Sequence, residues 1–432
     1  METNPTRIAE ILVGLPAVNI LGVDDVDGEP LLIHIEARVE RPRCPRCSGG
    51  AWVKDRPEVE LVDLPAFGRP TRIVWRKRRL IYACECSTAS FTEQVPTIAP
   101  PRGKMTDRAG RWVTYQVGKL GRSIQEVADE LGADWHTVND AVLAYGTALV
   151  DDDDGRIGEV AALGLDETLF VRKGKWRSKN WSTSIVGVGA DEARLLDVVE
   201  GRSAKGPSEW IEAQPKEWRD GICFGVLDLS GPYRKVFEDT LAHATQIADP
   251  FHVVKLANTK PDACRRRVQN ETLGHRGQKA DPLYRARRLL TKAHERLDEK
   301  GEAKLMGLLR AGDPHGDVRM AWHAKEVIRS IYEIDDPQLA ATFVTELAAD
   351  LQDDSFPVEV RSLGRTLRRW FDQIVAWHQV RYSNGPTEAI NNLIKRVKRI
   401  ALGFRRFRNY RIRALLYAGR PNWDLLPTVT PR

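Results

Sequence analysis

Three acidic residues, far apart in the sequence, have positions that suit a shared divalent metal ion. Asp166 lies on a predicted strand, Asp228 ends the apolar strand 222–227, and Glu388 falls in the first turn of a predicted helix. Burying an unpaired carboxylate beside an apolar strand is costly, and a cation shared by two aspartates would compensate their charge. Mg²⁺ prefers such oxygen ligands and keeps waters and substrate phosphates in its shell. The three acids therefore suggest metal-dependent phosphoryl transfer, in which water or a 3′-hydroxyl attacks a phosphodiester.

Each of these acids also has a simple structural explanation. Aspartate is common in the turns at strand ends, and the helix dipole favours a glutamate in the first turn of a helix. Asp249 is a rival ligand because it too ends a predicted strand. We interpret Asp249 and His252 as residues that do not bind the metal but position the residues that do. Direct binding of the metal by Asp249 is the alternative. His252 could equally be a satisfied histidine at the start of a helix. The joint placement of the three acids favours the metal site.

The predicted elements around these acids indicate an α/β fold. Strands and helices follow one another from Val160 onward in the order β-β-β-α-β-α-β-α, which is the order of an RNase H-like fold. In that fold the strand of Asp166 lies beside the strand that ends in Asp228. Residues from about 260 to 380 are helical and strongly charged, which indicates an all-α insertion before Glu388. The insertion could contact DNA or a second subunit, or its role could be purely structural.

Four of the six cysteines occur as two close pairs in the N-terminal part. Cys44 and Cys47 form a CxxC pair, Cys84 and Cys86 form a CxC pair, and strands are predicted between the pairs. Two such pairs joined by a β-ribbon are typical of a structural Zn²⁺ site with four thiolate ligands. Because CxC is tighter than the usual CxxC spacing, free or degenerate cysteines are the alternative.

A predicted helix-turn-helix follows the proline-rich joint at residues 96–101. Ser123 and Glu126 have the spacing of a capping box, and Gly132 ends the helix that they begin. A second helix is predicted from about 135 to 145. A recognition helix of this kind would present outward-facing side chains to base edges. The residues of this unit that we expect to contact DNA are Arg122, His136, Thr137 and Asn139. A plain helical hairpin is the alternative.

The composition indicates a globular protein that binds a polyanion. Of the 432 residues, 42% are hydrophobic and 29% are charged, which excludes a disordered chain. No run approaches the ~20 apolar residues of a membrane span, and residues 1–20 do not resemble a secretion signal, so we expect a cytoplasmic protein without membrane contact. The net charge of +6 is unevenly distributed: no acid occurs from Ala389 to Trp423, and a second basic cluster spans residues 69–79. Two separated basic stretches favour a polyanion held at more than one place.

Four motifs resemble those of the DDE transposases of bacterial insertion sequences, specifically the ISL-three type. They are Gly164-Leu-Asp166-Glu167, Val226-Leu-Asp228, Ala248-Asp249-Pro-Phe251-His252-Val-Val-Lys255 and Asn384-Gly-Pro-Thr-Glu388-Ala-Ile-Asn391-Asn-Leu-Ile-Lys395. The basic segment 399–413 is also similar to that group, as is the order of a cysteine-rich ribbon, a helix-turn-helix and a catalytic core. The resemblance runs from about Arg41 to Leu416. It implies that Asp166, Asp228 and Glu388 take the three acidic roles and bind Mg²⁺ or Mn²⁺.

This resemblance implies that the protein catalyses DNA transposition. It would bind the terminal inverted repeats of its own element, cut a DNA strand, and join the new 3′-hydroxyl to target DNA. Holding two DNA ends together implies a homodimer, associated with the bacterial nucleoid. The C-terminal residues that we expect to contact DNA are Asn391, Lys395, Lys398, Arg399, Arg405 and Arg406. Two alternatives are a domesticated, non-cleaving DNA-binding regulator and a structure-selective nuclease of the RNase H type.

The predicted domain boundaries follow from these assignments. We expect an N-terminal segment at 1–40, a zinc-ribbon-like domain at 41–100, a helix-turn-helix at 101–150, the first part of an RNase H-like core at 158–258, a helical insertion at 259–380, and the second part of the core with basic C-terminal helices at 381–432.

Overall fold

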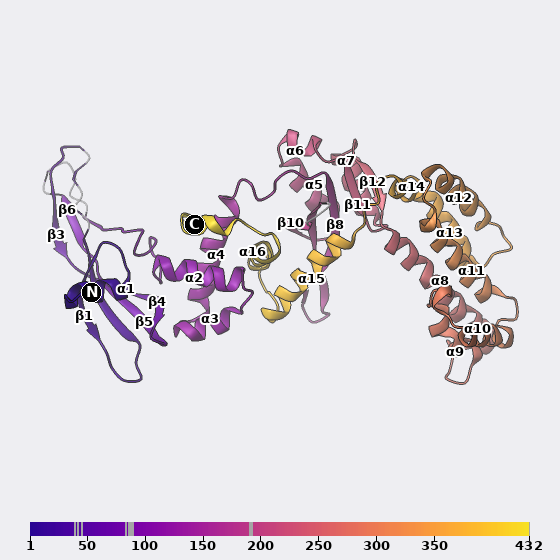
Figure 1. Ribbon diagram of the computed structural model, residues 1–432, viewed down its shortest axis with the longest axis horizontal. Helices are drawn as coiled ribbons and strands as arrows, with labels where there is room; N and C mark the ends of the chain where they lie inside the picture. Colours follow the sequence, from indigo (N-terminus) through magenta and orange to yellow (C-terminus); the bar gives the residue numbers. More distant parts are fainter. Residues whose placement is uncertain are drawn as a thin grey trace.

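The computed structural model describes residues 1–38, 40, 43–44, 46–82, 84, 90–189 and 193–431. Figure 1 shows an elongated molecule with a β-rich N-terminal part at one end and a group of helices at the other. A mixed sheet lies between them, next to the last two α-helices of the chain. Within the described residues, no helix is long and apolar enough to cross a membrane.

Two small sheets form the N-terminal part. Their elements are α1 (Pro5–Val13), β1 (Val18–Asp24), β2 (Leu31–Ala37), β3 (Ala51–Asp55), β4 (Glu58–Ala66), β5 (Arg69–Arg76), β6 (Arg79–Tyr82) and β7 (Ser90–Thr92). One sheet has the order β1-β2-β5-β4 and the other β3-β6-β7. Alternate residues of β2 and β5, including Ile35, Ile73 and Trp75, are fully buried, as expected of strands with one face on a core. The first sheet thus joins strands from both sides of the boundary predicted at residue 40.

Three helices follow, namely α2 (Asp107–Gly118), α3 (Ile124–Leu131) and α4 (Trp135–Asp151). The predicted capping box is confirmed: the Ser123 hydroxyl accepts a hydrogen bond from the Glu126 N–H, and the Glu126 carboxylate accepts one from the Ser123 N–H. Gly132 ends α3 in the left-handed conformation, with φ of 56°. Gly110 in α2 allows Tyr145 of α4 to approach closely, since a Cβ there would lie 2.2 Å from the ring.

The central sheet has five strands in the order β10-β9-β8-β11-β12. They are β8 (Ala162–Lys173), β9 (Ser178–Val188), β10 (Ala193–Glu200), β11 (Phe224–Leu227) and β12 (Thr245–Ala248). β9 is antiparallel to both β8 and β10, and β11 is parallel to both β8 and β12. Between them lie α5 (Lys205–Glu212), α6 (Lys216–Asp220) and α7 (Gly231–Thr240). The predicted order of strands and helices is confirmed, with the first predicted helix divided into α5 and α6.

Helices cover both faces of this sheet. Gly225 of β11 meets the Phe237 ring of α7 on one face, where a Cβ would lie 2.5 Å from the ring. Gly164 of β8 pairs with Val226 and therefore points to the other face, where it meets Thr387 of α15 (Gly385–Ile400). The last α-helix, α16 (Phe407–Ala418), packs against α15, β10 and α4. The C-terminal segment thereby connects the sheet to the three-helix unit.

The segment between β12 and α15 is entirely helical apart from its loops. It contains α8 (Pro250–Leu273), α9 (Pro282–Leu290), α10 (Glu299–Gly312), α11 (Asp317–Ser330), α12 (Pro337–Asp350), α13 (Val358–Arg369) and α14 (Phe371–Val380). The boundary predicted at residue 259 falls inside α8, which begins directly after β12 and extends away from the sheet (Figure 1). α14 returns to pack against β12.

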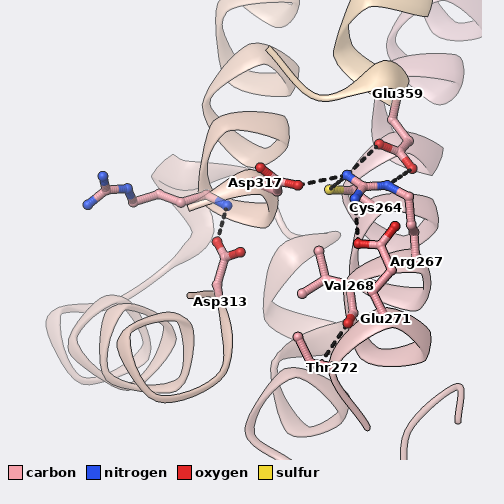
Figure 2. Close-up of polar contacts among 9 residues, drawn as sticks. Cys264, Arg267, Val268, Glu271, Thr272, Asp313, Asp317 and Glu359 are labelled. Carbon is pink, nitrogen blue, oxygen red and sulfur yellow. Dashed lines mark hydrogen bonds and ion pairs between the residues drawn. The ribbon is translucent and has the colours of Figure 1, made fainter. Parts of the chain in front are cut away.

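Arg267 of α8 ties three of these helices together (Figure 2). Its guanidinium donates to the Glu359 carboxylate of α13 at 3.0 Å and to Asp317 at the start of α11 at 2.8 Å. It also bonds Glu271 one turn further along α8 at 2.9 Å. These contacts raise the pKa of Arg267 above its usual value, chiefly through the hydrogen bond to Glu359. A planar guanidinium suits this role because it offers several donors in fixed directions.

Candidate active site and DNA-binding surfaces

The sheet places Asp166 and Asp228 side by side. β8 and β11 run parallel, with Gly164 paired to Val226, and Asp228 directly follows the last residue of β11. If this register continued for two residues, Asp166 would lie opposite Asp228, and the charge of Asp166 does raise the pKa of Asp228. Adjacent strands lie about 4.8 Å apart, and residues two apart share a face. Both aspartates therefore belong to the face that α15 covers.

α15 approaches this face because residue 164 has no side chain. A Cβ on Gly164 would lie 2.2 Å from the Thr387 hydroxyl, far inside van der Waals contact. The next residue of α15 is Glu388, in the first turn of the helix, where its N–H donates to the Asn384 carbonyl at 2.9 Å. The close contact between β8 and α15 thus brings the third acid to the face that carries the two aspartates.

Asn391 links α15 to the sheet. Its amide nitrogen donates to Asp166 Oδ2 at 2.6 Å, and its oxygen accepts from Thr168 at 3.1 Å and from Ser184 at 2.7 Å. We expected Asn391 to contact DNA, but its side chain is 1% exposed and points into the protein. Asn391 fixes the orientation of the Asp166 carboxylate instead. Thr168 lies on β8 and Ser184 on β9, so Asn391 connects α15 to both strands.

Asp228 has an incompletely satisfied carboxylate. Its Oδ1 atom is buried and has no hydrogen-bond partner among the described residues. Burial, followed by the nearby charge of Asp166, raises the pKa of Asp228 to about 7. The pKa of Glu167 is also raised, by burial and by Asp166. A divalent cation would supply the positive charge that this group of acids lacks, so the residues fit a metal with oxygen ligands.

Asp249 is occupied by contacts within the protein. Its Oδ1 accepts the Asn384 N–H at 2.8 Å, and its Oδ2 contacts the N–H and Nδ1 of His252 at 3.2 and 2.9 Å. The residue is 2% exposed and caps α8. Asp249 therefore connects the start of α8 to the start of α15, the segment that holds Glu388.

His252 faces the acids from the start of α8. Its Nε2 lies 3.8 Å from Glu388 Oε1. The hydrogen bond to Asp249 raises the pKa of His252, with further contributions from Asp249, Asp228 and Glu388, while burial opposes them. A protonated His252 would place positive charge beside the three acids.

The three acids do not form a closed set of ligands. In the part of the chain that the structure describes, only Cys44, Cys47 and Cys84 form a group of at least three metal-binding side chains whose ligand atoms all lie within 4.8 Å of one another. Asp166, Asp228 and Glu388 leave more space between them. That spacing suits an ion that retains waters and substrate oxygens in its shell.

The three cysteines form a compact thiolate cluster at the second N-terminal sheet. Cys44 precedes β3 and Cys84 follows β6, and these two strands are paired. Hydrogen bonds from the backbone of Arg46, then Cys47, lower the pKa of Cys44 to about 7, which favours the metal-binding thiolate. Cys86, the fourth predicted ligand, lies outside the described residues. The cluster could hold Zn²⁺, which prefers four such ligands.

Removing one thiolate is expected to release the metal and loosen this sheet. For Cys44→Ser, we expect loss of one equivalent of bound Zn²⁺ and a fall of at least ~5 °C in the melting midpoint of the N-terminal part, because metal binding and folding are coupled. Metal analysis and thermal unfolding of the full chain measure both effects. Cys223→Ser, at an exposed cysteine outside the cluster, is the control. Equal zinc content in all three proteins would contradict the prediction.

The helix-turn-helix presents fewer outward side chains than we predicted. His136 is exposed at the start of α4, and Arg122 is partly exposed and pairs with Glu130 at 2.6 Å. Thr137 and Asn139 are 5% and 6% exposed, so the prediction that they face outward is wrong. The Thr137 hydroxyl donates to Asp134, and Asn139 accepts a hydrogen bond from Asn409 near the start of α16. α16 packs against α4 on the side that carries Asn139.

The basic C-terminal residues line an exposed surface beside the acids. Lys395, Arg399, Arg405 and Arg406 are exposed, as DNA contacts must be. Lys398 is partly buried and donates to the Leu169 carbonyl of β8 at 2.6 Å. A hollow of about 420 Å³ lies between β8 and the end of α15, with Thr168 on one side and Lys395 and Arg399 on the other. Lys395, Lys398 and Arg399 thus lie next to the strand that carries Asp166.

Comparison with known proteins identifies the family. A family model described as "Transposase" matches residues 163–414, and one described as "Helix-turn-helix domain of transposase family ISL3" matches residues 93–146. A 63-residue segment is 41% identical to a Lactococcus lactis subsp. lactis protein described as "ATP-dependent protease"; it covers 15% of this chain and only 20% of that protein. The solved "Drosophila P element transposase strand transfer complex" is similar over 75% of this chain and 94% of its own, with 9% identity and a TM-score of 0.40, too low to support an argument. Because the first family model covers more than half of the chain, the protein belongs to the ISL3 family of transposases.

Proposed function

We propose that this protein binds the terminal inverted repeats of its insertion sequence and catalyses metal-dependent strand cleavage and strand transfer. One observation carries the proposal: Asp166 on β8 and Asp228 at the end of the adjacent parallel strand β11 lie where α15 brings Glu388, and the buried Oδ1 of Asp228 has no hydrogen-bond partner among the described residues. Such a group of acids suits phosphodiester chemistry, in which charge develops on the attacking and leaving oxygens.

The proposed catalytic core is an RNase H-like domain. The sheet order β10-β9-β8-β11-β12, with three antiparallel strands followed by two parallel ones, supports this assignment. Residues 158–258 and 381–432 would form the core, and the helices between them the insertion. The N-terminal sheets and the helix-turn-helix would form separate DNA-reading units.

Each residue at the site has a proposed task. Asp166, Asp228 and Glu388 would hold Mg²⁺ or Mn²⁺. When bound, the ion would supply activation of the attacking oxygen and stabilisation of the leaving oxygen. Asn391 holds the Asp166 carboxylate in one orientation through its 2.6 Å hydrogen bond. Asp249 positions His252 and the start of α15, and the exposed Lys395 and Arg399 would bind phosphates of the DNA strand.

The proposed partners are transposon ends and target DNA. The zinc-binding sheet and the helix-turn-helix would read the repeats, and a homodimer in the bacterial cytoplasm, associated with the nucleoid, would hold two ends together. The match of residues 93–146 to a helix-turn-helix family supports the DNA-binding part of this proposal.

The test uses the purified full-length protein and a labelled duplex that carries the DNA flanking its gene. We expect a single cut at a repeat boundary in Mg²⁺ or Mn²⁺, no cut in EDTA, and no cut in a duplex with a scrambled repeat. Tight and specific binding without cleavage in any divalent metal would favour the non-cleaving regulator. Cleavage independent of the repeat sequence would favour a structure-selective nuclease.

A further inference from the structure

The hairpin between β8 and β9 presents an exposed tryptophan at its tip, with Lys175 Nζ 5.9 Å from the centre of its ring. β8 ends at Lys173, and a turn closed by the Arg177 N–H and the Gly174 carbonyl at 3.0 Å leads into β9. Gly174 and Arg177 both have positive φ, 71° and 49°, which fixes the reversal of the chain. Trp176 lies in this turn and is 86% exposed. An aromatic side chain of this size is usually buried or placed at a binding surface.

The hairpin carries positive charge only. Arg172, Lys173, Lys175, Arg177 and Lys179 occur within eight positions, and no acidic residue occurs between Glu167 and Asp191. All five cations are exposed, and none forms an ion pair with another described residue. A surface of this composition attracts a polyanion and disfavours partners that carry no negative charge to balance it. We name residues 172–179 the basic hairpin.

The basic hairpin continues the positive surface beside the active site. Lys398 of α15 donates to the Leu169 carbonyl, and its pKa is lowered by burial and by the neighbouring Arg172. The hollow formed by Thr168, Leu169, Lys395 and Arg399 lies on the same strand, between the acids and the hairpin. A strand rises about 3.3 Å per residue, so the end of β8 lies roughly 23 Å from Asp166. That length corresponds to about seven nucleotides of one DNA strand.

We propose that the basic hairpin binds DNA about seven nucleotides from the cleavage point. The Trp176 ring would stack on a base that is no longer stacked within the duplex. The five cations would bind the flanking phosphates. Cations contact the phosphates of intact duplex as well as of single strands. An aromatic ring can stack on any base, but only on one whose face is free. The exposed tryptophan therefore favours an unstacked base over intact duplex. This inference rests on the proposed function, because it requires DNA held at the three acids.

The experiment uses the full-length protein and the flanking-DNA duplex described above, with 2-aminopurine placed at single positions up to ten nucleotides from the cut. We expect the wild type to change the fluorescence at one or two adjacent positions. Trp176→Ala should abolish that change and raise Kd for the duplex by about 10-fold, while Trp176→Phe retains part of both. Leu339→Ala is the control, since Leu339 is an exposed apolar residue (59%) on α12 (Pro337–Asp350), outside the proposed DNA-binding surfaces.

The outcomes separate this inference from the proposed function. Wild-type cleavage with equal Kd and equal fluorescence in Trp176→Ala would overturn the inference and leave the transposase proposal intact. A change of oligomeric state in Trp176→Ala, with the fluorescence signal unchanged, would also overturn it and identify the tip as a protein contact. Absence of both binding and cleavage by the wild type would overturn the proposed function, and the inference with it. Trp176 is at an exposed turn, so unchanged thermal unfolding of the variants will show that they fold.

Discussion

Asp228→Asn is expected to lower the rate of strand cleavage by at least ~10³-fold while changing Kd for the end-bearing duplex by less than about twofold. The substitution keeps the shape of the side chain but removes the charge that would hold the metal. It acts at the carboxylate whose Oδ1 is buried without a partner. Single-turnover cleavage of the labelled duplex measures the first effect, and a binding titration in Ca²⁺ measures the second.

A matched substitution at an exposed acid is the control for this prediction. Asp220 of α6 has a side chain that is 56% exposed, and its one ion pair among the described residues is with Lys216 of the same helix. Asp220→Asn should cleave at the wild-type rate. Cleavage by Asp228→Asn within tenfold of the wild type would show that this aspartate is not part of the metal site.

The same variant should also change how stability depends on pH in the metal-free protein. The pKa of Asp228 is raised to about 7 from 3.8, so the folded protein binds this proton more tightly than the unfolded chain. Between those two pKa values the folded state holds more protons, and the free energy of unfolding therefore falls as the pH rises from about 4 to 7 and stays level above. The wild type should lose roughly 3 kcal/mol over this window relative to Asp228→Asn. Denaturant unfolding at pH 4.5 and 7.5 measures the difference, and parallel pH profiles would contradict it.

Gly164→Ala should disrupt the site without touching any of its acids. The new Cβ would lie 2.2 Å from the Thr387 hydroxyl, so α15 must move away from β8 and carry Glu388 with it. We expect a loss of about 2 kcal/mol in the free energy of unfolding from the steric overlap. The cleavage rate should fall about 10²-fold, because a displacement of 1 Å is enough to misplace a catalytic group.

A double variant distinguishes this displacement from a general loss of stability. In Gly164→Ala with Thr387→Ala, the nearest remaining atoms are the Cβ of residue 387 at 3.5 Å, a normal contact, and Val188 Cγ2 at 3.1 Å, a tight contact that a shift of a few tenths of an ångström would relieve. The double variant should recover most of the activity and stability, giving a coupling of about 1–2 kcal/mol. Gly22→Ala, at a strand glycine with nothing within 4 Å, is the neutral control. Additive losses in the double variant would exclude the proposed contact.

Much of the central domain could be predicted from local patterns. The apolar strand 222–227 ends at Asp228 and predicts the position of that acid on a sheet edge, and the capping box at Ser123 and Glu126 marks the start of α3. These features depend on residues that are neighbours in the sequence. The same holds for the order of strands and helices, because each element is specified by its own periodicity.

The features that could not be predicted depend on contacts between distant segments. Asn139 is a polar residue near the start of α4, and it is buried where α16 packs on α4 and Asn409 donates a hydrogen bond to it. Asn391 is separated from Asp166 by 225 positions, so its role as the partner of that carboxylate has no local signature. The N-terminal sheet likewise pairs β2 with β5, and no pattern within either strand identifies its neighbour.

The hydrogen bond between Asp249 and Asn384 also affects how this architecture can vary. These residues are 135 positions apart. The chain leaves the central domain at Asp249 and returns to it at Asn384, and the two residues are joined by a 2.8 Å hydrogen bond. The intervening helices therefore begin and end at the same point of the central domain. The contacts between Asp249 and Asn384, beside the three acids, can stay the same whatever this helical segment contains. Doubling the length of such a closed segment costs only about 0.6 kcal/mol. Related chains could exchange, shorten or enlarge this segment while the geometry of the acids stays the same, and a protein engineer could use the same position to insert a foreign domain.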